Sequence, residues 1–248
     1  MDHLAHCDAL EVEIAFFADV LGASDVHRPV PSCPEWDIAG LAGHLGGVHR
    51  WAEHLVRHLA HARNASPAMW ADDGPVDAAW IRDGGARLLT TLRSTDPNLE
   101  MWAWGADQHV RFWSRRQLHE TLVHRIDLEL ANGLQPHTDD EVAADAIDEF
   151  LVNLPAAARF SPRIAELRGL AGRVAFRDAR TGRHWTVSSR PDGAGLSADA
   201  GPVDATMTAD GLDLLLALYR RRSLEDVECV VDGDAALLRV WLDHLALE

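Results

Sequence analysis

The chain has 248 residues, and its 23 basic and 39 acidic side chains give a formal net charge of −16. A hydrophobic content of 47% and a charged content of 25% are typical of globular proteins and exclude disordered, collagen-like and disulfide-scaffold classes. The strongly negative charge, without any basic run, also argues against binding to nucleic acid or to an anionic membrane.

Apolar residues at helical spacing dominate the first part of the chain. Before the second predicted helix, the three prolines of HRPVPSCPEW predict an extended connector. Asn132-Gly133 predicts the end of the fourth helix. We therefore expect an N-terminal helical bundle over residues 1–155, with helices at 3–22, 36–63, 76–94, 112–131 and 139–153.

The pattern changes near Gly172, where short runs with strand-like composition alternate with turn signals. We expect a smaller α+β domain over residues 171–248, with a boundary at 155–171. The predicted strands are 172–179, 183–189, 203–209 and 225–231, and the predicted helices are 211–222 and 234–246.

Cysteine usage and the N-terminal residues bear on the cell compartment. Cys7, Cys33 and Cys229 are widely separated and odd in number, which favours free thiols in a reducing compartment. The first residues lack the basic start and apolar run of a signal peptide. No stretch approaches the roughly 20 apolar residues of a membrane span. We therefore expect a cytoplasmic protein without a membrane partner, and the oligomeric state stays open.

His44 is the most informative of the 14 histidines. Because each residue turns about 100° around a helix axis, Leu45, Val48 and Leu55 lie on the same broad face as His44. That face is apolar, so His44 is predicted to face the bundle interior.

The other histidines favour structural interpretations. His54, His58 and His61 share a flank nearer to solvent, where a solvated face is favoured over a metal site. His49 and His119 are expected to lie on helix flanks and not to bind metal.

Glu120 and His124 lie four residues apart on the fourth predicted helix, which places their side chains next to each other. The spacing alone favours an exposed Glu–His pair. The alternative is a site in which this pair joins His44 across the bundle, because two imidazoles and one carboxylate hold zinc or iron(II) and leave positions open. Asp127, one turn further on, could then accept a hydrogen bond from a ligand imidazole and orient it.

Two motifs carry a resemblance to a known family. VPSCPEWDIAGLAGHLGGVHRW (Val30–Trp51) and LHETLVHRIDLEL (Leu118–Leu130) are similar to motifs of the mycothiol-dependent maleylpyruvate isomerase-like family. GLDLLLALYRRRSLEDVECVVDGDAALL is similar to its C-terminal domain. The resemblance implies a DinB-like four-helix bundle followed by a sterol-carrier-like α+β domain.

The resemblance also implies a site and an activity. His44, Glu120 and His124 match the three metal ligands of the family, with zinc the usual metal. The metal is expected to activate the thiolate of mycothiol, the thiol cosubstrate, for attack on a small electrophile, because a divalent cation favours the deprotonated thiol. The expected enzyme is an isomerase or an S-transferase, and no residue is assigned a catalytic role beyond metal binding.

The chain departs from the family where Leu-Trp-Gly-Arg is common, since it has Leu218-Tyr219-Arg220-Arg221. Arg221 keeps the matching position and could bind a substrate carboxylate or the thiol cosubstrate. Arg220 adds bulk and charge beside it and puts the substrate in doubt. For Arg220 and Arg222, a solvated helix end is the favoured interpretation.

Two other functions remain open at this stage. A non-catalytic member of the family would keep the fold for binding or sensing. A metal hydrolase would need a general base, for which Asp127 is the only obvious candidate, although an orienting role suits it better.

Several remaining residues are predicted to be structural. Trp36, Trp51 and Trp113 are expected in the core, with some chance that one lines the pocket, and Cys33 is expected to be a free thiol. The Gly46-Gly47 pair is expected to allow close packing of helices.

Overall fold

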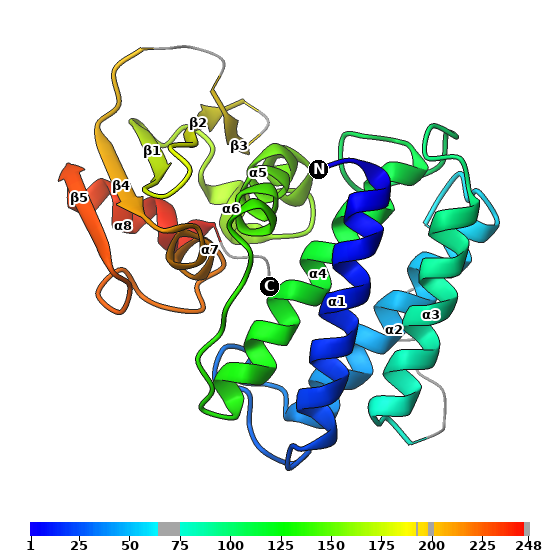
Figure 1. Ribbon diagram of the computed structural model, residues 1–248. Coiled ribbons are helices and arrows are strands. Elements are labelled where there is room, and N and C mark those ends of the chain that lie inside the picture. The colour runs from blue at the N-terminus through cyan, green and yellow to red at the C-terminus, as the bar shows by residue number, and fades with distance from the viewer. Residues whose placement is uncertain (64–74, 192, 198–200, 246–248) are drawn as a thin grey trace. The chain divides into compact units, whose positions relative to one another are not determined.

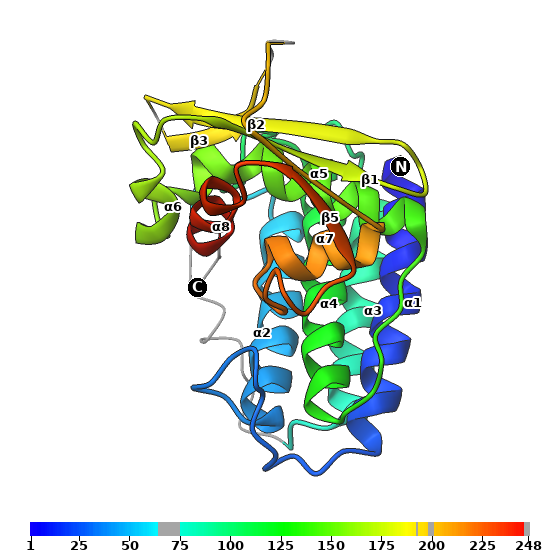
Figure 2. The ribbon, with the colours of Figure 1, turned by 90° about the vertical axis from the view of Figure 1, so that its left-hand side faces the viewer.

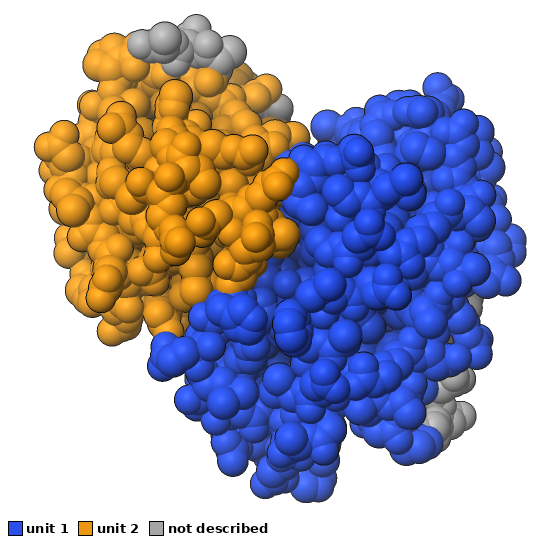
Figure 3. Space-filling view, viewed as in Figure 1, with its two compact units in different colours: residues 1–137 blue, residues 138–248 orange. Residues whose placement is uncertain are grey.

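The computed structural model describes residues 1–63, 75–191, 193–197 and 201–245. The chain divides into two compact units, Met1–His137 and Thr138–Glu248, which are coloured separately in Figure 3. None of the helices in the described ranges combines the length and apolar character needed to cross a membrane.

In the described part of the first unit, four helices form a bundle, and they run side by side (Figure 1). They are α1 (His3–Gly22), α2 (Ile38–Arg57), α3 (Ala78–Ser94) and α4 (Val110–Ala131). The structure confirms the predicted four-helix bundle. Helix α4 packs against α1 and α2 and is buried along most of its surface, so its polar side chains meet other protein groups instead of water.

Aspartate residues begin most of these helices and several of the second unit. At each such position the carboxylate accepts a hydrogen bond from a backbone N–H of the first turn, which satisfies a donor that has no partner within the helix. Some of the many acidic residues of the chain therefore stabilise the first turns of its helices. These residues are Asp2, Asp37, Asp77, Asp139, Asp210 and Asp234.

The proline-rich connector before α2 is a compact turn, and the predicted extended conformation is wrong. The N–H of Cys33 donates to the carbonyl of Val30 at 3.0 Å, and the N–H of Trp36 donates to the carbonyl of Cys33 at 2.9 Å. The N–H of Val30 donates back to the carbonyl of Trp36 at 3.0 Å. These backbone bonds close the segment on itself and fix where its side chains lie.

The second unit has the predicted α+β composition. Strand β3 and the short helix α6 were not predicted, since each has five residues or fewer. The elements are α5 (Asp140–Ala157), α6 (Pro162–Glu166), β1 (Arg173–Asp178), β2 (His184–Arg190), β3 (Gly193–Leu196), β4 (Ala205–Ala209), α7 (Gly211–Leu218), β5 (Cys229–Gly233) and α8 (Ala235–His244).

The strands form one sheet in the order β3-β2-β1-β4-β5. Strands β1 and β4 are parallel, with Phe176 opposite Met207, and the other neighbours are antiparallel. Helices of the unit gather on one face of the sheet (Figure 2). The alternating burial along β4 reflects this arrangement, because Ala205, Met207 and Ala209 are buried while the residues between them are half-buried.

Helix α5 belongs to the second unit, so the domain boundary lies earlier than the expected 155–171. The division falls between His137 and Thr138. Helix α5 packs against β3 and α7 and buries Ile147 and Phe150 there. Helical periodicity shows that α5 has an apolar face, but it does not show which neighbour covers that face.

Candidate metal centre

His44 on α2 and the Glu120–His124 pair on α4 converge on one point in the first unit. Ligand atoms of the three residues all lie within 4.8 Å of one another. The Nε2 atoms of His44 and His124 lie 3.2 Å and 3.3 Å from the same Oε1 atom of Glu120. In the part of the chain that the structure describes, no other group of three metal-binding side chains meets in this way.

The donor set fits a divalent metal. Two imidazole nitrogens and one carboxylate oxygen are ligands that zinc and iron(II) both accept, and three protein ligands leave positions open for a small molecule. Zinc and iron(II) are not distinguished by these donors.

His44 is less buried than its apolar helix face predicts. Its side chain is 31% exposed, against 11% for His124. Gly40 lies one turn before His44 and has no side chain to cover the imidazole. The cluster is therefore accessible from the His44 side.

Asp127 is fully buried and accepts hydrogen bonds from three side chains. Nδ1 of His124 lies 2.9 Å from its Oδ2, and the Ser32 hydroxyl donates to its Oδ1 at 2.6 Å. The Cys33 thiol points to Oδ2 at 3.9 Å. Because Nδ1 of His124 is engaged by Asp127, its Nε2 is the atom directed at Glu120 and His44. With its oxygens so occupied, Asp127 is poorly suited to act as the general base of a hydrolase.

The two α4 residues of the cluster have opposite pKa shifts. Burial alone would raise the pKa of Glu120, but hydrogen bonds from His124 and His44 outweigh it and hold the pKa well below its ordinary value. Burial would lower the pKa of His124, but hydrogen bonds to Asp127 and Glu120 outweigh it and raise the pKa to about 9. Without a metal, the cluster therefore holds an imidazolium beside a carboxylate, and a metal must displace that proton.

Arg116 and Trp36 also belong to the site, and the sequence analysis did not assign them to it. Nη2 of Arg116 lies 3.2 Å from Oε2 of Glu120, and the Arg116 side chain is only 5% exposed. The Trp36 ring lies 4.7 Å from the His44 ring and 6.0 Å from the His124 ring, centroid to centroid. Trp36 is therefore a half-buried wall of the site and not a core residue. The four-residue spacing of Arg116 and Glu120 could have indicated their contact from the sequence.

Of the other histidines, two differ from the expectation. His49 and His119 are fully buried, so they lie deeper in the bundle than the expected helix flanks. Neither belongs to the metal-ligand cluster. His58 and His61 are exposed and His54 is half-buried, which agrees with the predicted solvated flank.

The remaining structural predictions are confirmed. Trp51 and Trp113 are buried, and their rings meet edge to face with centroids 5.3 Å apart. Cys33 is half-buried and is not in a disulfide. Gly46 faces the ring of Trp80, and a Cβ atom at that position would lie 1.8 Å from it.

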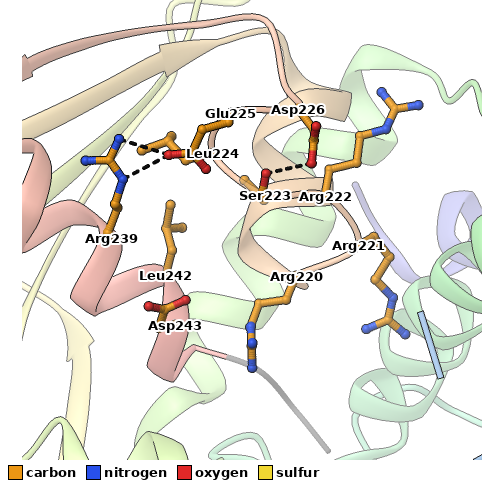
Figure 4. Close-up of a pocket in the computed structure, with 11 residues that line it drawn as sticks. Arg220, Arg221, Arg222, Ser223, Leu224, Glu225, Asp226, Arg239, Leu242 and Asp243 are labelled. Atoms are coloured by element: carbon orange, nitrogen blue, oxygen red, sulfur yellow. Dashed lines mark hydrogen bonds and ion pairs between the residues drawn. The ribbon is translucent and has the colours of Figure 1, made fainter. Parts of the chain in front are cut away.

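Arg221 lies in the second unit, where it lines a cavity of about 580 Å³ together with Arg220 and Arg222 (Figure 4). One guanidinium nitrogen of Arg221 donates to the carbonyl of Tyr219 at 2.9 Å. A guanidinium nitrogen of Arg222 lies 3.7 Å from a carboxylate oxygen of Asp213. Arg220 and Arg222 thus follow the end of α7, as expected, but they also contribute to the cavity wall.

Arg220 occupies a backbone position that favours glycine. Its φ is +55°, and it follows the end of α7, where its N–H donates to Ala217 and that of Arg221 donates to Leu216. This is the Schellman arrangement, in which the left-handed residue is usually glycine. The glycine of the family pattern would adopt this conformation without strain, whereas Arg220 does so at a cost of about 1 kcal/mol.

Comparisons with known proteins agree with this architecture. The domain described as "Mycothiol maleylpyruvate isomerase N-terminal domain" matches residues 7–129. The domain described as "MDMPI C-terminal domain" matches residues 141–239. No curated protein sequence matches the chain.

Two solved structures have the same fold over nearly the whole chain. A crystal structure of the mycothiol-dependent maleylpyruvate isomerase superimposes with a TM-score of 0.59 at 14% identity, and covers 92% of this chain and 93% of that one. A histidine-to-alanine mutant of the same enzyme gives a TM-score of 0.60 at 13% identity, with the same two coverages. Together the two domain matches and the shared fold show that the chain belongs to the mycothiol-dependent maleylpyruvate isomerase-like family.

Proposed function

We propose that this protein is a metal-dependent enzyme that uses mycothiol as its thiol cosubstrate and acts on a small electrophile as an isomerase or S-transferase. The observation that carries the proposal is the convergence of ligand atoms from His44, Glu120 and His124 within 4.8 Å. Membership of the family supplies the thiol. Zinc is the proposed metal, because the resemblance to the family implies zinc as the usual metal and the donor set accepts it.

Each residue has a distinct part in this proposal. His44, Glu120 and His124 would hold the metal, whose positive charge favours the thiolate form of a bound thiol. Asp127 keeps the imidazole of His124 oriented through its bond to Nδ1, as in other histidine-ligated metal sites. The His44 side chain is 31% exposed, which would give the thiol and the electrophile an approach to the site.

Arg221 is proposed to bind a carboxylate of the electrophile or of the thiol cosubstrate. Its guanidinium lines the cavity of the second unit and offers donors in the planar arrangement that carboxylates accept.

In an isomerase, the thiolate would add to a conjugated double bond, the resulting single bond would rotate, and the thiol would leave. In a transferase, the thiol would remain on the product.

The first test is metal content per chain, measured by mass spectrometry on tag-free protein. We expect about one zinc per wild-type chain, and loss of the metal in His44→Ala and His124→Ala variants that still fold. His54→Ala is the matched control, because His54 is on the same helix as His44 but outside the cluster. It should keep the wild-type metal content.

A second measurement separates the enzyme from a non-catalytic member of the same fold. Metal-loaded protein is incubated with mycothiol and a panel of small electrophiles, and loss of the free thiol and isomerisation of the electrophile are followed. Consumption or isomerisation that disappears in His44→Ala supports the enzyme. Metal binding without any thiol-dependent reaction would favour the binding module, and failure to bind zinc, iron or nickel would refute the metal-dependent proposal.

A further inference from the structure

The two carboxylate oxygens of Glu120 face different partners. Oε1 lies 3.2 Å from Nε2 of His44 and 3.3 Å from Nε2 of His124. Oε2 lies 3.2 Å from Nη2 of Arg116. One oxygen thus contacts the two histidines of the cluster, and the other contacts a guanidinium.

Arg116 is held in place by the fold. It lies one helical turn before Glu120 on α4, and its side chain is 5% exposed. Its guanidinium carbon lies 6.0 Å from the centre of the Trp104 ring, so the cation is next to an aromatic face. A buried guanidinium keeps its charge, and a charge removed from water acts on its neighbours through a lower effective dielectric.

We propose that Arg116 is a positioning residue that makes Glu120 a one-oxygen metal ligand and offsets its negative charge. This inference rests on the proposed function, because Arg116 acts on the metal through Glu120. Held at Oε2, the carboxylate cannot turn to offer both oxygens, so the metal keeps an open position for the thiol. With the Glu120 charge offset by Arg116, the metal attracts a thiolate more strongly.

The proposal predicts that metal binding and thiol binding can be separated by mutation. Removal of a metal-binding side chain would abolish both. Without Arg116, the three ligand atoms remain, so the metal still binds. Glu120 is then free to bind through both oxygens, and its uncompensated charge weakens the attraction for a thiolate. The expected defect is therefore in thiol binding and not in metal binding.

The test uses the full chain loaded with Co²⁺, whose visible absorption reports coordination number and whose sulfur-to-metal charge-transfer band reports thiolate binding. The variants are Arg116→Gln, which removes the charge, and Arg116→Lys, which keeps it. Arg111→Gln is the matched control, because Arg111 is on the same helix and its removal changes the net charge equally, but its partners are Asp107 and Asn98. The thiol probe is 2-mercaptoethanol at neutral pH.

We expect Arg116→Gln to bind Co²⁺ while its affinity for 2-mercaptoethanol falls about tenfold, the size of effect that one nearby charge exerts. Its visible absorption should also weaken, as it does when cobalt gains a ligand atom. Arg116→Lys and Arg111→Gln should keep thiol affinities close to that of the wild type. If Arg116→Gln does not fold, Arg116→Met replaces it, because methionine also removes the charge, and the same tenfold loss of thiol affinity is expected.

Three results would overturn the inference. One is wild-type thiol affinity and absorption in Arg116→Gln. The second is an equal loss in Arg111→Gln, which would trace the effect to overall charge. The third is a tenfold loss in metal-loaded Arg116→Lys. Wild-type protein that binds no Co²⁺ at all would instead refute the proposed function, and the role of Arg116 with it.

Discussion

His49 and His124 are both buried in the bundle, yet the fold moves their pKa values in opposite directions. Burial lowers the pKa of His49 to about 3. His49 faces a neutral partner, the hydroxyl of Thr121 at 2.9 Å, and this hydroxyl donates to the carbonyl of Gln117. His124 is also buried, with 11% of its side chain exposed, but the carboxylates of Asp127 and Glu120 raise its pKa to about 9. Neighbouring charge, and not depth, decides whether a buried histidine here is neutral or charged.

The low pKa of His49 predicts a specific loss of stability in acid. The ordinary histidine pKa is 6.5 and the folded value is about 3, so between these values the unfolded chain binds a proton that the folded chain does not. The contribution of His49 is therefore complete above pH 6.5 and is lost as the pH falls, by about 1.4 kcal/mol per pH unit.

The measurement is the free energy of unfolding in urea as a function of pH, with a chelator present. His49→Gln, which does not titrate, should lose less stability than the wild type between pH 6 and pH 4, by about 1 kcal/mol or more. His54→Gln, altered at a half-buried position on the same helix, should follow the wild-type curve. Parallel curves for His49→Gln and the wild type would show that His49 is not neutral in the folded protein.

At the scale of elements, the glycines of α2 show how closely α3 approaches it. A Cβ atom at Gly46 would lie 1.8 Å from the ring of Trp80 on α3, whereas a Cβ atom at Gly43 would meet nothing within 4 Å. The two positions are in the same helix and differ only in what they face. Gly46 is needed for the approach of Trp80, and Gly43 is not needed for packing.

We therefore expect alanine to have opposite effects at these two glycines. Gly46→Ala should reduce the free energy of unfolding by about 1–3 kcal/mol, because the ring of Trp80 must move. Gly43→Ala should increase it by about 0.5–1 kcal/mol, since alanine favours the helix and has room. Urea unfolding of the two variants measures both effects. Equal shifts in the two would contradict the assigned helix contact.

At the scale of the whole molecule, the proposed functional residues are divided between the two units. Arg221 lies within residues 138–248. The other proposed functional residues lie within residues 1–137, and they are His44, Glu120, His124, Asp127 and Arg116. The first unit buries its own apolar core and contains the whole ligand cluster. The proposed metal site therefore belongs to one unit, and the proposed anion contact belongs to the other.

This division predicts that residues 1–137, produced alone, fold cooperatively and bind one metal per chain with the affinity of the full protein. The fragment lacks Arg221, so it should lose the thiol-dependent reaction that the full chain carries out. Circular dichroism, thermal unfolding and metal titration measure the first expectation, and the thiol assay measures the second. A folded fragment with much weaker metal binding would show that the second unit contributes to the metal centre.

Local spacing in the sequence predicted several features correctly. The four helices of the bundle follow from apolar residues at helical intervals, and the Glu120–His124 pair follows from a spacing of four residues on one helix. Asp127 falls on the same stripe for the same reason. The motifs around these residues and around His44 also indicated the family that the two domain matches confirm.

Contacts between side chains of different helices and loops became visible only in the folded chain. The partner of Glu120 Oε2, the ring of Trp36 beside His44 and the burial of His49 all depend on how neighbouring segments pack, which periodicity does not encode. The observed domain boundary differs from the expected one for the same reason, because the sequence does not show which unit covers the apolar face of α5. Local spacing determines which residues share one face of a helix. Which other element covers that face depends on how the whole chain packs.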